Sequence, residues 1–145
     1  YLAQSPGEFW RRWHISLSSW FRDYLFIPLG GSRCGPARNA FNLLLTFFVS
    51  GLWHGADWNY VLWGLWWGVL VLGEHLVGPR LPAWSRSAWL APVRVALMLG
   101  AIHVGWLLFR ETNIHYLWKY LRTPPWAADA TQWRVAWYLF NLTFL

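Results

Sequence analysis

Two histidines in this sequence have neighbours that suit acid–base chemistry. His54 lies between Trp53 and Gly55, where an uncharged run that begins at Phe41 ends. His14 lies in the segment W-H-I-S-L. A neutral imidazole, with an ordinary pKa of about 6.5, can accept a proton near neutral pH. We therefore predict proton transfer as the chemistry of one or both rings.

The histidines also allow structural interpretations, which the sequence leaves open. His54 could hydrogen-bond a carbonyl group at the end of its helix, and His14 could be a buried core residue. His103, inside an apolar run, could bond a neighbouring helix, relay protons, or bind haem together with His75 or His14. A haem-binding helical bundle and a non-catalytic membrane scaffold are the alternatives to an enzyme.

Other catalytic patterns are absent from the sequence. It contains no H-E-x-x-H metal motif, no G-x-S-x-G nucleophile motif and no glycine-rich phosphate loop. Cys34 stands alone in a turn rich in glycine, proline and arginine. We therefore expect no metal site and no bound cofactor.

The composition is apolar, rich in tryptophan and poor in charge, and it does not exclude a membrane protein. Of 145 residues, 57% are hydrophobic, 12% are charged and 15 are Trp, whereas about 25% of a soluble domain is charged. The mean hydropathy of +0.25 is modest because the scale scores Trp and Tyr as slightly polar, although their rings favour the bilayer interface. The net charge is +6, but no run of bases exceeds Arg11-Arg12, so nucleic-acid binding is not expected. Scattered arginines are better suited to lipid headgroups.

One amphipathic helix is expected at the start of the chain. Ser5 followed by Pro6 and Glu8 has the pattern of a capping box, which predicts a helix start, and Pro28 predicts its end. On a helical wheel of about 100° per residue, apolar side chains fill one arc that also contains His14. We therefore predict that His14 faces protein or lipid, and that the helix lies at the membrane interface.

Apolar runs separated by polar turns follow. Residues 41–53 are uncharged, and at about 1.5 Å per residue they reach only about 20 Å, short of the ~30 Å hydrocarbon core. We expect a short re-entrant helix that breaks at a polar turn and continues into the run at 60–72, with the turn buried in protein or lining a water-filled cavity. Residues 88–109 are long enough to span, and a final run begins near Val135. The expected fold class is an all-α integral membrane protein with several transmembrane helices.

The arginines before Phe41 place the N-terminal portion on the cytoplasmic side. The chain opens on Tyr1 without a signal peptide and closes on an apolar run. We therefore expect residues 1–145 to be an internal part of a longer protein.

Three stretches of the sequence resemble one known family. They are FWRRWHISLSSWFRDYLFIPLGGSR at residues 9–33, LLLTFFVSGLWHGADWNYVLWGLWWG at residues 43–68 and GWLLFRETNI at residues 105–114. They are similar to the membrane-bound O-acyltransferases, and most of all to the bacterial branch that contains the alginate O-acetylation and teichoic acid D-alanyl transfer proteins. The resemblance makes residues 1–145 part of a catalytic domain, with its core motifs at residues 8–68.

The resemblance implies a ring of membrane helices around a thin centre, where donor and acceptor meet through a tunnel. It also implies that His54 is the catalytic residue and that His14 is a second functional residue. We expect His54 to act as general base and His14 to orient the substrate or polarise the acyl carbonyl. Arg22 and Asp23 are expected to organise the donor entrance, and Trp53 to contact substrate.

The implied reaction moves an acyl group, with acetyl as the expected one, from a thioester donor to a hydroxyl group. The donor would be acetyl-coenzyme A or an acyl-carrier thioester, and the acceptor an exported polysaccharide, a teichoic acid or a relay protein. The expected location is the bacterial cytoplasmic (inner) membrane, with lipid as a further partner. Because family members are considerably longer, the isolated chain is expected to be inactive.

Overall fold

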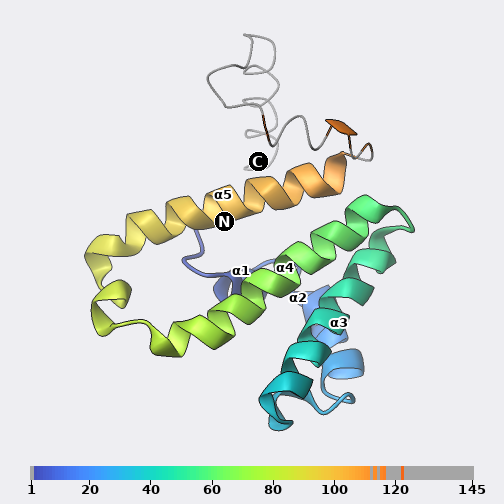
Figure 1. The fold of residues 1–145 in the computed structure, drawn as a ribbon, viewed down its shortest axis with the longest axis horizontal. Coiled ribbons are helices and arrows are strands. Elements are labelled where there is room, and N and C mark those ends of the chain that lie inside the picture. The colour runs from blue at the N-terminus through green and yellow to red at the C-terminus, as the bar shows by residue number, and fades with distance from the viewer. Residues whose placement is uncertain (1, 112, 114, 117–121, 123–145) are drawn as a thin grey trace. The chain divides into compact units, whose positions relative to one another are not determined.

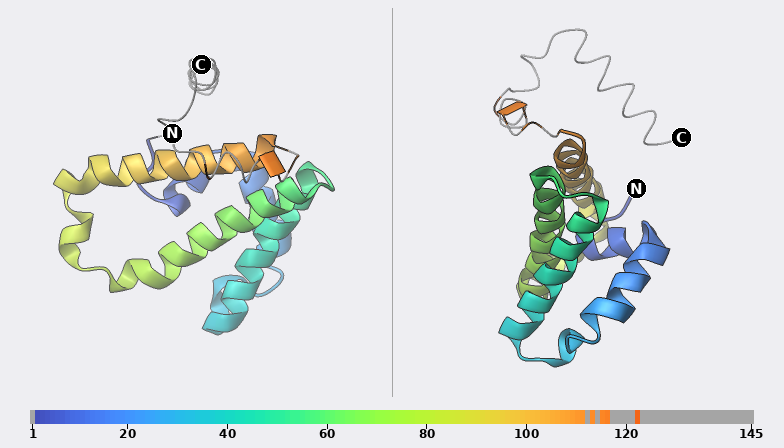
Figure 2. Two further views of the ribbon diagram at one scale, coloured as in Figure 1. Left: turned by 45° about the horizontal axis from the view of Figure 1, so that its top comes forward. Right: turned by 90° about the vertical axis from the view of Figure 1, so that its right-hand side faces the viewer.

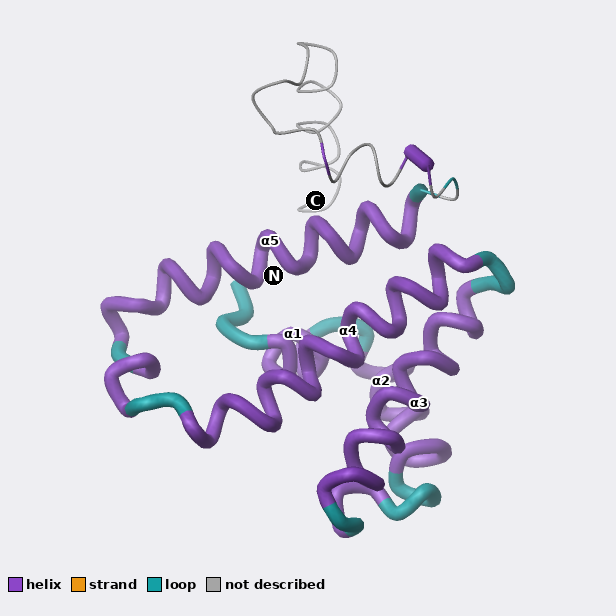
Figure 3. The backbone as a smooth tube through the Cα atoms, in the orientation of Figure 1, coloured by secondary structure: helices purple, strands orange, loops and turns teal. Residues whose placement is uncertain are grey.

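The computed structural model describes residues 2–111, 113, 115, 116 and 122 of the chain (Figure 1). The final run expected near Val135 lies outside these residues. The longer helices of the described part are α3, α4 and α5, and shorter helical segments precede and connect them (Figure 3). In chain order the elements before the connection to α5 are α1 (Pro6–Arg12), α2 (Ile15–Phe21), the π-helical turn η1 (Arg22–Phe26), the 3-10 turn η2 (Gly31–Arg33), α3 (Pro36–His54) and α4 (Trp58–Val77).

The predicted helix start at Ser5 is confirmed, but the continuous helix is wrong. The Ser5 side chain accepts a hydrogen bond from the Glu8 amide at 3.2 Å. Helix α1 then ends, Trp13 is extended, and His14 takes a left-handed conformation with φ 47° and ψ 48° before α2 begins. The break gives each short helix its own packing direction, and it buries Phe9 from α1 and Phe21 from α2.

The predicted shortness of the third helix is also wrong. Helix α3 has 19 residues, about 28 Å at 1.5 Å per residue, because the helix continues for five residues on the N-terminal side of Phe41. The uncharged run was a poor guide to length, since Arg38 lies within the helix. The predicted break is confirmed at residues 55–57, but the chain reverses there, so α3 and α4 form a hairpin (Figure 1).

Glycines set the close approach of the two hairpin helices. A Cβ atom at Gly51 would collide with the carbonyl oxygen of Tyr60, and one at Gly64 would collide with the carbonyl oxygen of Phe47. Small residues let membrane helices pack backbone against backbone. The two collisions pair an early residue of one helix with a late residue of the other, as an antiparallel hairpin requires.

Helix α5 (Ala91–Arg110) returns alongside α4, so that its C-terminal end lies beside the α3–α4 turn (Figures 1 and 2). The connection consists of three 3-10 turns, η3 (Gly78–Arg80), η4 (Ala83–Arg86) and η5 (Ala88–Leu90). Two segments of the described part, Trp58–Arg80 and Ala88–Arg110, are long and apolar enough to cross a membrane. Helix α1 packs on α4 and η1 packs on α3. The N-terminal helices thus line one side of the hairpin.

Candidate active site

His54 occupies the last position of α3, at the hairpin turn. The helix end is closed by the Gly55 amide, which donates to the Leu52 carbonyl oxygen at 3.2 Å. A Cβ atom at Gly55 would lie 2.5 Å from the Tyr60 ring, so glycine allows that ring to fold back over the turn. Among the described residues, the His54 side chain does not cap the helix.

Aromatic rings surround the His54 imidazole. Trp63 and Phe109 each lie edge-on with ring centroids 5.0 Å away, and Tyr60 lies 6.4 Å away. Trp53 lies at 4.9 Å, but its side chain is exposed. The Nε2 atom of His54 is buried and has no hydrogen-bond partner among the described residues. An unpaired buried nitrogen retains its full capacity to bond a substrate.

Asn59 joins the end of α5 to this turn. Its side chain is 5% exposed, and its amide nitrogen donates to the Phe109 carbonyl oxygen at 3.1 Å. That carbonyl belongs to the last turn of α5, where backbone acceptors lack a helical partner. The bond therefore holds Phe109 in place, and the Phe109 ring in turn packs against His54.

His14 lies at the edge of the same group of aromatic side chains. Its ring contacts Trp13, with ring centroids 5.5 Å apart. Trp13 meets Trp106 at 6.0 Å, and Trp106 meets Phe109 at 6.3 Å. The side chain of His14 is exposed in the described part of the chain, so the prediction that it faces protein or lipid stays a prediction. The left-handed backbone turns it out of the predicted apolar arc.

Stacked rings connect the N-terminal helices to the hairpin. Phe9 stacks on Trp67 at 4.8 Å, and Trp10 meets Trp63 edge-on at 5.9 Å. Such pairs contribute about 0.5–1.5 kcal/mol each beyond burial of their area. We call the set the aromatic cluster; it comprises Phe9, Trp10, Trp13, Tyr60, Trp63, Trp67, Trp106 and Phe109. The cluster fixes both histidines relative to each other, although they are 40 positions apart in the sequence.

Comparison with known protein families identifies the family of this chain. Residues 2–121 match the model of the membrane-bound O-acyltransferase family. The chain belongs to this family. That confirms the resemblance drawn from the three sequence stretches.

The names of relatives in the family refer to different acceptors. The chain is 48% identical over 115 residues to a probable alginate O-acetylase of Pseudomonas fluorescens, covering 79% of this chain and 22% of that protein. It is 33% identical over 132 residues to a peptidoglycan O-acetyltransferase of Helicobacter pylori, covering 84% and 23%. A teichoic acid D-alanyltransferase of Bacillus subtilis is 33% identical over 130 residues, covering 80% and 32%. The chain thus spans about a fifth to a third of the length of these relatives.

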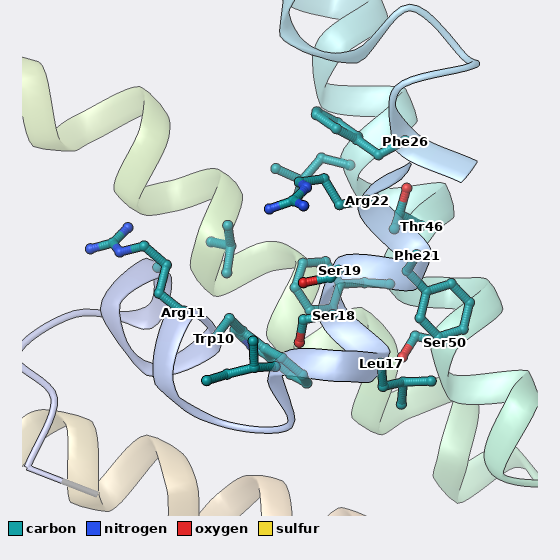
Figure 4. A pocket seen from close by; sticks show the side chains of 15 residues that line it. Trp10, Arg11, Leu17, Ser18, Ser19, Phe21, Arg22, Phe26, Thr46 and Ser50 are labelled. Carbon is teal, nitrogen blue, oxygen red and sulfur yellow. The ribbon is translucent and has the colours of Figure 1, made fainter. Parts of the chain in front are cut away.

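A groove of about 510 Å³ runs between the N-terminal helices and the hairpin (Figure 4). Its walls include apolar side chains from both sides, such as Leu17, Phe21 and Phe47. Neither His54 nor His14 lines it, but Ile15 follows His14 directly. The groove therefore lies beside the aromatic cluster rather than at the imidazoles themselves.

A polar stripe on α3 leads from this groove toward His54. Asn42, Thr46 and Ser50 precede His54 at intervals of four residues, which places them in neighbouring positions along the helix surface. Thr46 and Ser50 line the groove. Asn42 is fully buried and donates to the Leu29 carbonyl oxygen at 3.0 Å. Sequence reasoning missed the stripe, although the four-residue spacing of polar side chains in an apolar helix was the available signal.

Arg22 and Asp23 lie in η1 and form an ion pair at the groove. The Arg22 Nε and Nη2 atoms donate to the two carboxylate oxygens of Asp23 at 2.7 and 3.2 Å. This hydrogen bonding holds the pKa of the Asp23 carboxyl below its ordinary value. Arg22 also lines the groove, so the structure brings this predicted pair to the groove rather than to the histidines.

Two further histidines lie on α4 and α5. His75 lies near the opposite end of α4. His103 lies on α5, with its Nδ1 atom 2.7 Å from the Leu99 carbonyl oxygen of the same helix. Within the described part of the chain, no group of three or more His, Cys, Asp or Glu side chains could hold a metal ion.

Proposed function

We propose that the chain provides the catalytic base and part of the donor path of a membrane O-acyltransferase. The reaction moves an acyl group, proposed to be acetyl, from a thioester to a hydroxyl group of an exported polysaccharide or another cell-envelope acceptor. The proposed location is the bacterial cytoplasmic membrane, which the full-length protein crosses several times. The supporting observation is the buried, unpaired Nε2 atom of His54 inside the aromatic cluster.

His54 would remove the proton of the acceptor hydroxyl as that oxygen attacks the thioester carbonyl carbon. The new C–O bond forms, the C–S bond breaks, and the imidazolium returns the proton to the departing thiolate. A neutral imidazole suits both steps. The surrounding rings favour this neutral form, because they offer the charged form no counterion.

His14 would orient the substrate or polarise the acyl carbonyl. Its left-handed backbone supports this role, since a non-glycine residue in that conformation is uncommon and clusters at functional sites. The contact between its ring and Trp13 connects it to the cluster that holds His54.

The groove is the proposed path for the arm of the thioester donor. Its apolar walls suit an aliphatic chain, and Thr46 and Ser50 offer hydroxyl groups on the way to His54. Arg22, positioned by Asp23, would bind an anionic part of the donor at the groove. Acetyl-coenzyme A and an acyl-carrier thioester both present such groups. Trp53 is proposed to contact the acceptor, because its exposed ring lies beside His54.

The test is acyl transfer by the full-length protein carrying His54→Ala. Loss of a general base lowers turnover by about 10²–10⁴-fold, and we expect a loss in this range. His103→Gln is the matched control, since it removes an imidazole outside the aromatic cluster, and turnover should stay within about twofold of the parent. Both variants must reach the membrane in parental amounts. Turnover of His54→Ala near the parental value would contradict the proposal.

A further inference from the structure

A basic pocket lies at the end of α4 opposite to His54. Its volume is about 780 Å³, and it is formed by the segment before α1, by α1 itself, by the last turns of α4, by the connecting turns and by the start of α5. The charged and titratable side chains that line it are Arg11, Glu74, His75, Arg86 and Arg94. No sequence motif marks this pocket, because its residues come from segments far apart in the chain.

Among the described residues, none of the three arginines of the basic pocket forms an ion pair within 4 Å. Arg94 donates to the side-chain oxygen of Gln4 and to the carbonyl oxygens of Ser85 and Ser87, and all of these acceptors are uncharged. Arg86 donates to the Gly78 carbonyl oxygen at 2.8 Å. Arg12 and Arg22, which lie outside the pocket, do form ion pairs, with Glu8 and Asp23.

Glu74 is the one acidic side chain among the residues that line the pocket, and it is already engaged. Its Oε2 atom accepts from the Gly7 amide at 2.6 Å. Three arginines against one carboxylate leave the pocket with a formal charge of +2 when His75 is neutral. An anionic ligand would therefore meet a positive field there.

The pocket lies at the ends of two helices that are candidates to cross the membrane. Helix α4 ends at Val77 and α5 begins at Ala91, and each has 20 residues, about 30 Å, so their ends reach the headgroup layer. Trp84 and Trp89 in the connection are 64% and 71% exposed. Exposed tryptophans at helix ends are typical of the membrane–water interface.

We propose that the basic pocket binds the phosphate of an anionic phospholipid headgroup. Arg11 and Arg86 provide the donors, and Arg94 adds charge while holding the turns together. A lipid is favoured over a free anion because the exposed Leu81 side chain lines the pocket and can lie against acyl chains. Leu76 and Val77, which directly precede Gly78 of the pocket wall, are exposed as well. The proposal is independent of the acyl transfer chemistry at His54.

The test is native mass spectrometry of the full-length protein after delipidation. Phosphatidylglycerol and phosphatidylcholine with identical acyl chains are added back separately, and the retained lipid is titrated. We expect preferential retention of one phosphatidylglycerol, and about thirtyfold weaker retention in the double variant Arg11→Gln, Arg86→Gln, since each basic side chain near a membrane surface contributes about 1 kcal/mol. Equal retention of the two lipids by the parent would overturn the proposal.

Three controls make the result specific. The double variant Arg33→Gln, Arg38→Gln removes the same charge from exposed positions elsewhere and should retain phosphatidylglycerol like the parent; an equal loss there would show that net charge alone is responsible. The double variant Arg11→Lys, Arg86→Lys keeps the charge and should stay within about threefold of the parent, even if the glutamine variant fails to fold; a thirtyfold loss in folded lysine protein would contradict a phosphate site based on charge. Displacement of the lipid by inorganic phosphate at about ten millimolar would overturn the lipid in favour of a free-anion site.

Discussion

The two ends of helix α4 differ in side-chain packing, in exposure and in charge. At the Trp58 end the chain turns within three residues, buries Asn59, and packs rings on every side of His54. At the Val77 end it runs through three 3-10 turns, exposes two tryptophans and gathers three arginines. The first end is closed by aromatic packing, and the second is open and charged.

This difference in packing and charge suits the two ends of α4 to different surroundings, a packed aromatic site at one end and an open charged surface at the other. Burial at the closed end leaves several polar atoms without a hydrogen-bond partner among the described residues: the Nε2 atom of His54, the Nε1 atoms of Trp10 and Trp106, and the Oδ1 atom of Asn59. Of these, the imidazole nitrogen is the one that can accept a proton near neutral pH. At the open end the arginines bond carbonyl oxygens of their own turns, so they hold the connection together and keep their charge. The glycines near the two ends differ as well. Gly51, Gly55 and Gly64 are tightly packed near His54, whereas Gly73 and Gly78 have open space near Val77.

The largest effect is expected from a side chain placed between the hairpin helices. Gly64→Leu puts branched carbon against the Phe47 carbonyl oxygen, so the closed end cannot assemble, and we expect loss of folded protein by size-exclusion chromatography in detergent. Gly73→Ala is the matched control near the open end, where no atom lies within 4 Å of the added methyl group. It should fold as well as the parent, because alanine favours helix by about 1 kcal/mol over glycine. Equal tolerance of both changes would refute the close packing.

The variant His14→Asn tests whether the imidazole of His14 is needed for activity while its left-handed backbone conformation is retained. Asparagine tolerates the left-handed conformation, so the variant should keep the thermal stability of the parent while losing about tenfold to a hundredfold in acyl transfer. His14→Val is the companion variant, since a β-branched residue is strained at φ 47°, and it should also unfold at lower temperature. Full activity of the asparagine variant would show that the imidazole of His14 is not required.

A smaller effect is expected from Asn59→Ala, which leaves the Phe109 carbonyl oxygen without its donor. The loss of a buried hydrogen bond costs about 1–3 kcal/mol, and we expect an unfolding temperature lowered accordingly and turnover reduced by about fivefold at unchanged KM. Asp57→Ala is the control, because Asp57 lies in the same turn but its side chain makes no capping bond. If both variants behave alike, Asn59 does not position Phe109.

The smallest effect is expected from Asp23→Asn, outside the aromatic cluster. Thermal stability should not change measurably, because the Arg22–Asp23 pair is exposed, whereas KM for the donor should rise about threefold as Arg22 loses its anchor. The hydrogen bond lowers the pKa of Asp23, so the pair is present above the ordinary carboxyl value of about 3.9 and is lost only as pH falls through the lowered value. The difference between parent and variant should therefore be constant from about pH 6 to 8. A pH-dependent difference in this range would assign the effect to another group.

Several local features of the fold could be predicted from the sequence. Ser5, Pro6 and Glu8 signal a helix start through local hydrogen bonding, and Gly55 with its polar neighbours signals the break after His54. The three family stretches led to the correct family. These features depend on neighbours within a few residues, or on patterns shared by related chains, which a sequence displays directly.

The geometry of the site could not be predicted in the same way. A helical wheel assumes a continuous helix, so it placed His14 on an apolar arc that the left-handed turn interrupts. The start of α3 was missed because the length of the uncharged run was used to predict the length of the helix. The helix in fact begins before this run and includes Arg38. The basic pocket depends on Arg11, Arg86 and Arg94 meeting through tertiary packing, and no local preference encodes that meeting.

The hydrogen bond between the Gly7 amide and Glu74 has a consequence for biogenesis. Glu74 lies within a segment long enough to cross the membrane, and inserting a charged carboxylate costs about 2.5–3.5 kcal/mol. Its donor is synthesised 67 residues earlier, so it is already present outside the ribosome when α4 enters the bilayer. We expect docking of α1 to stabilise the inserted helix by supplying this hydrogen bond to Glu74. Helix α1 would thus assist the assembly of α4 within the same chain.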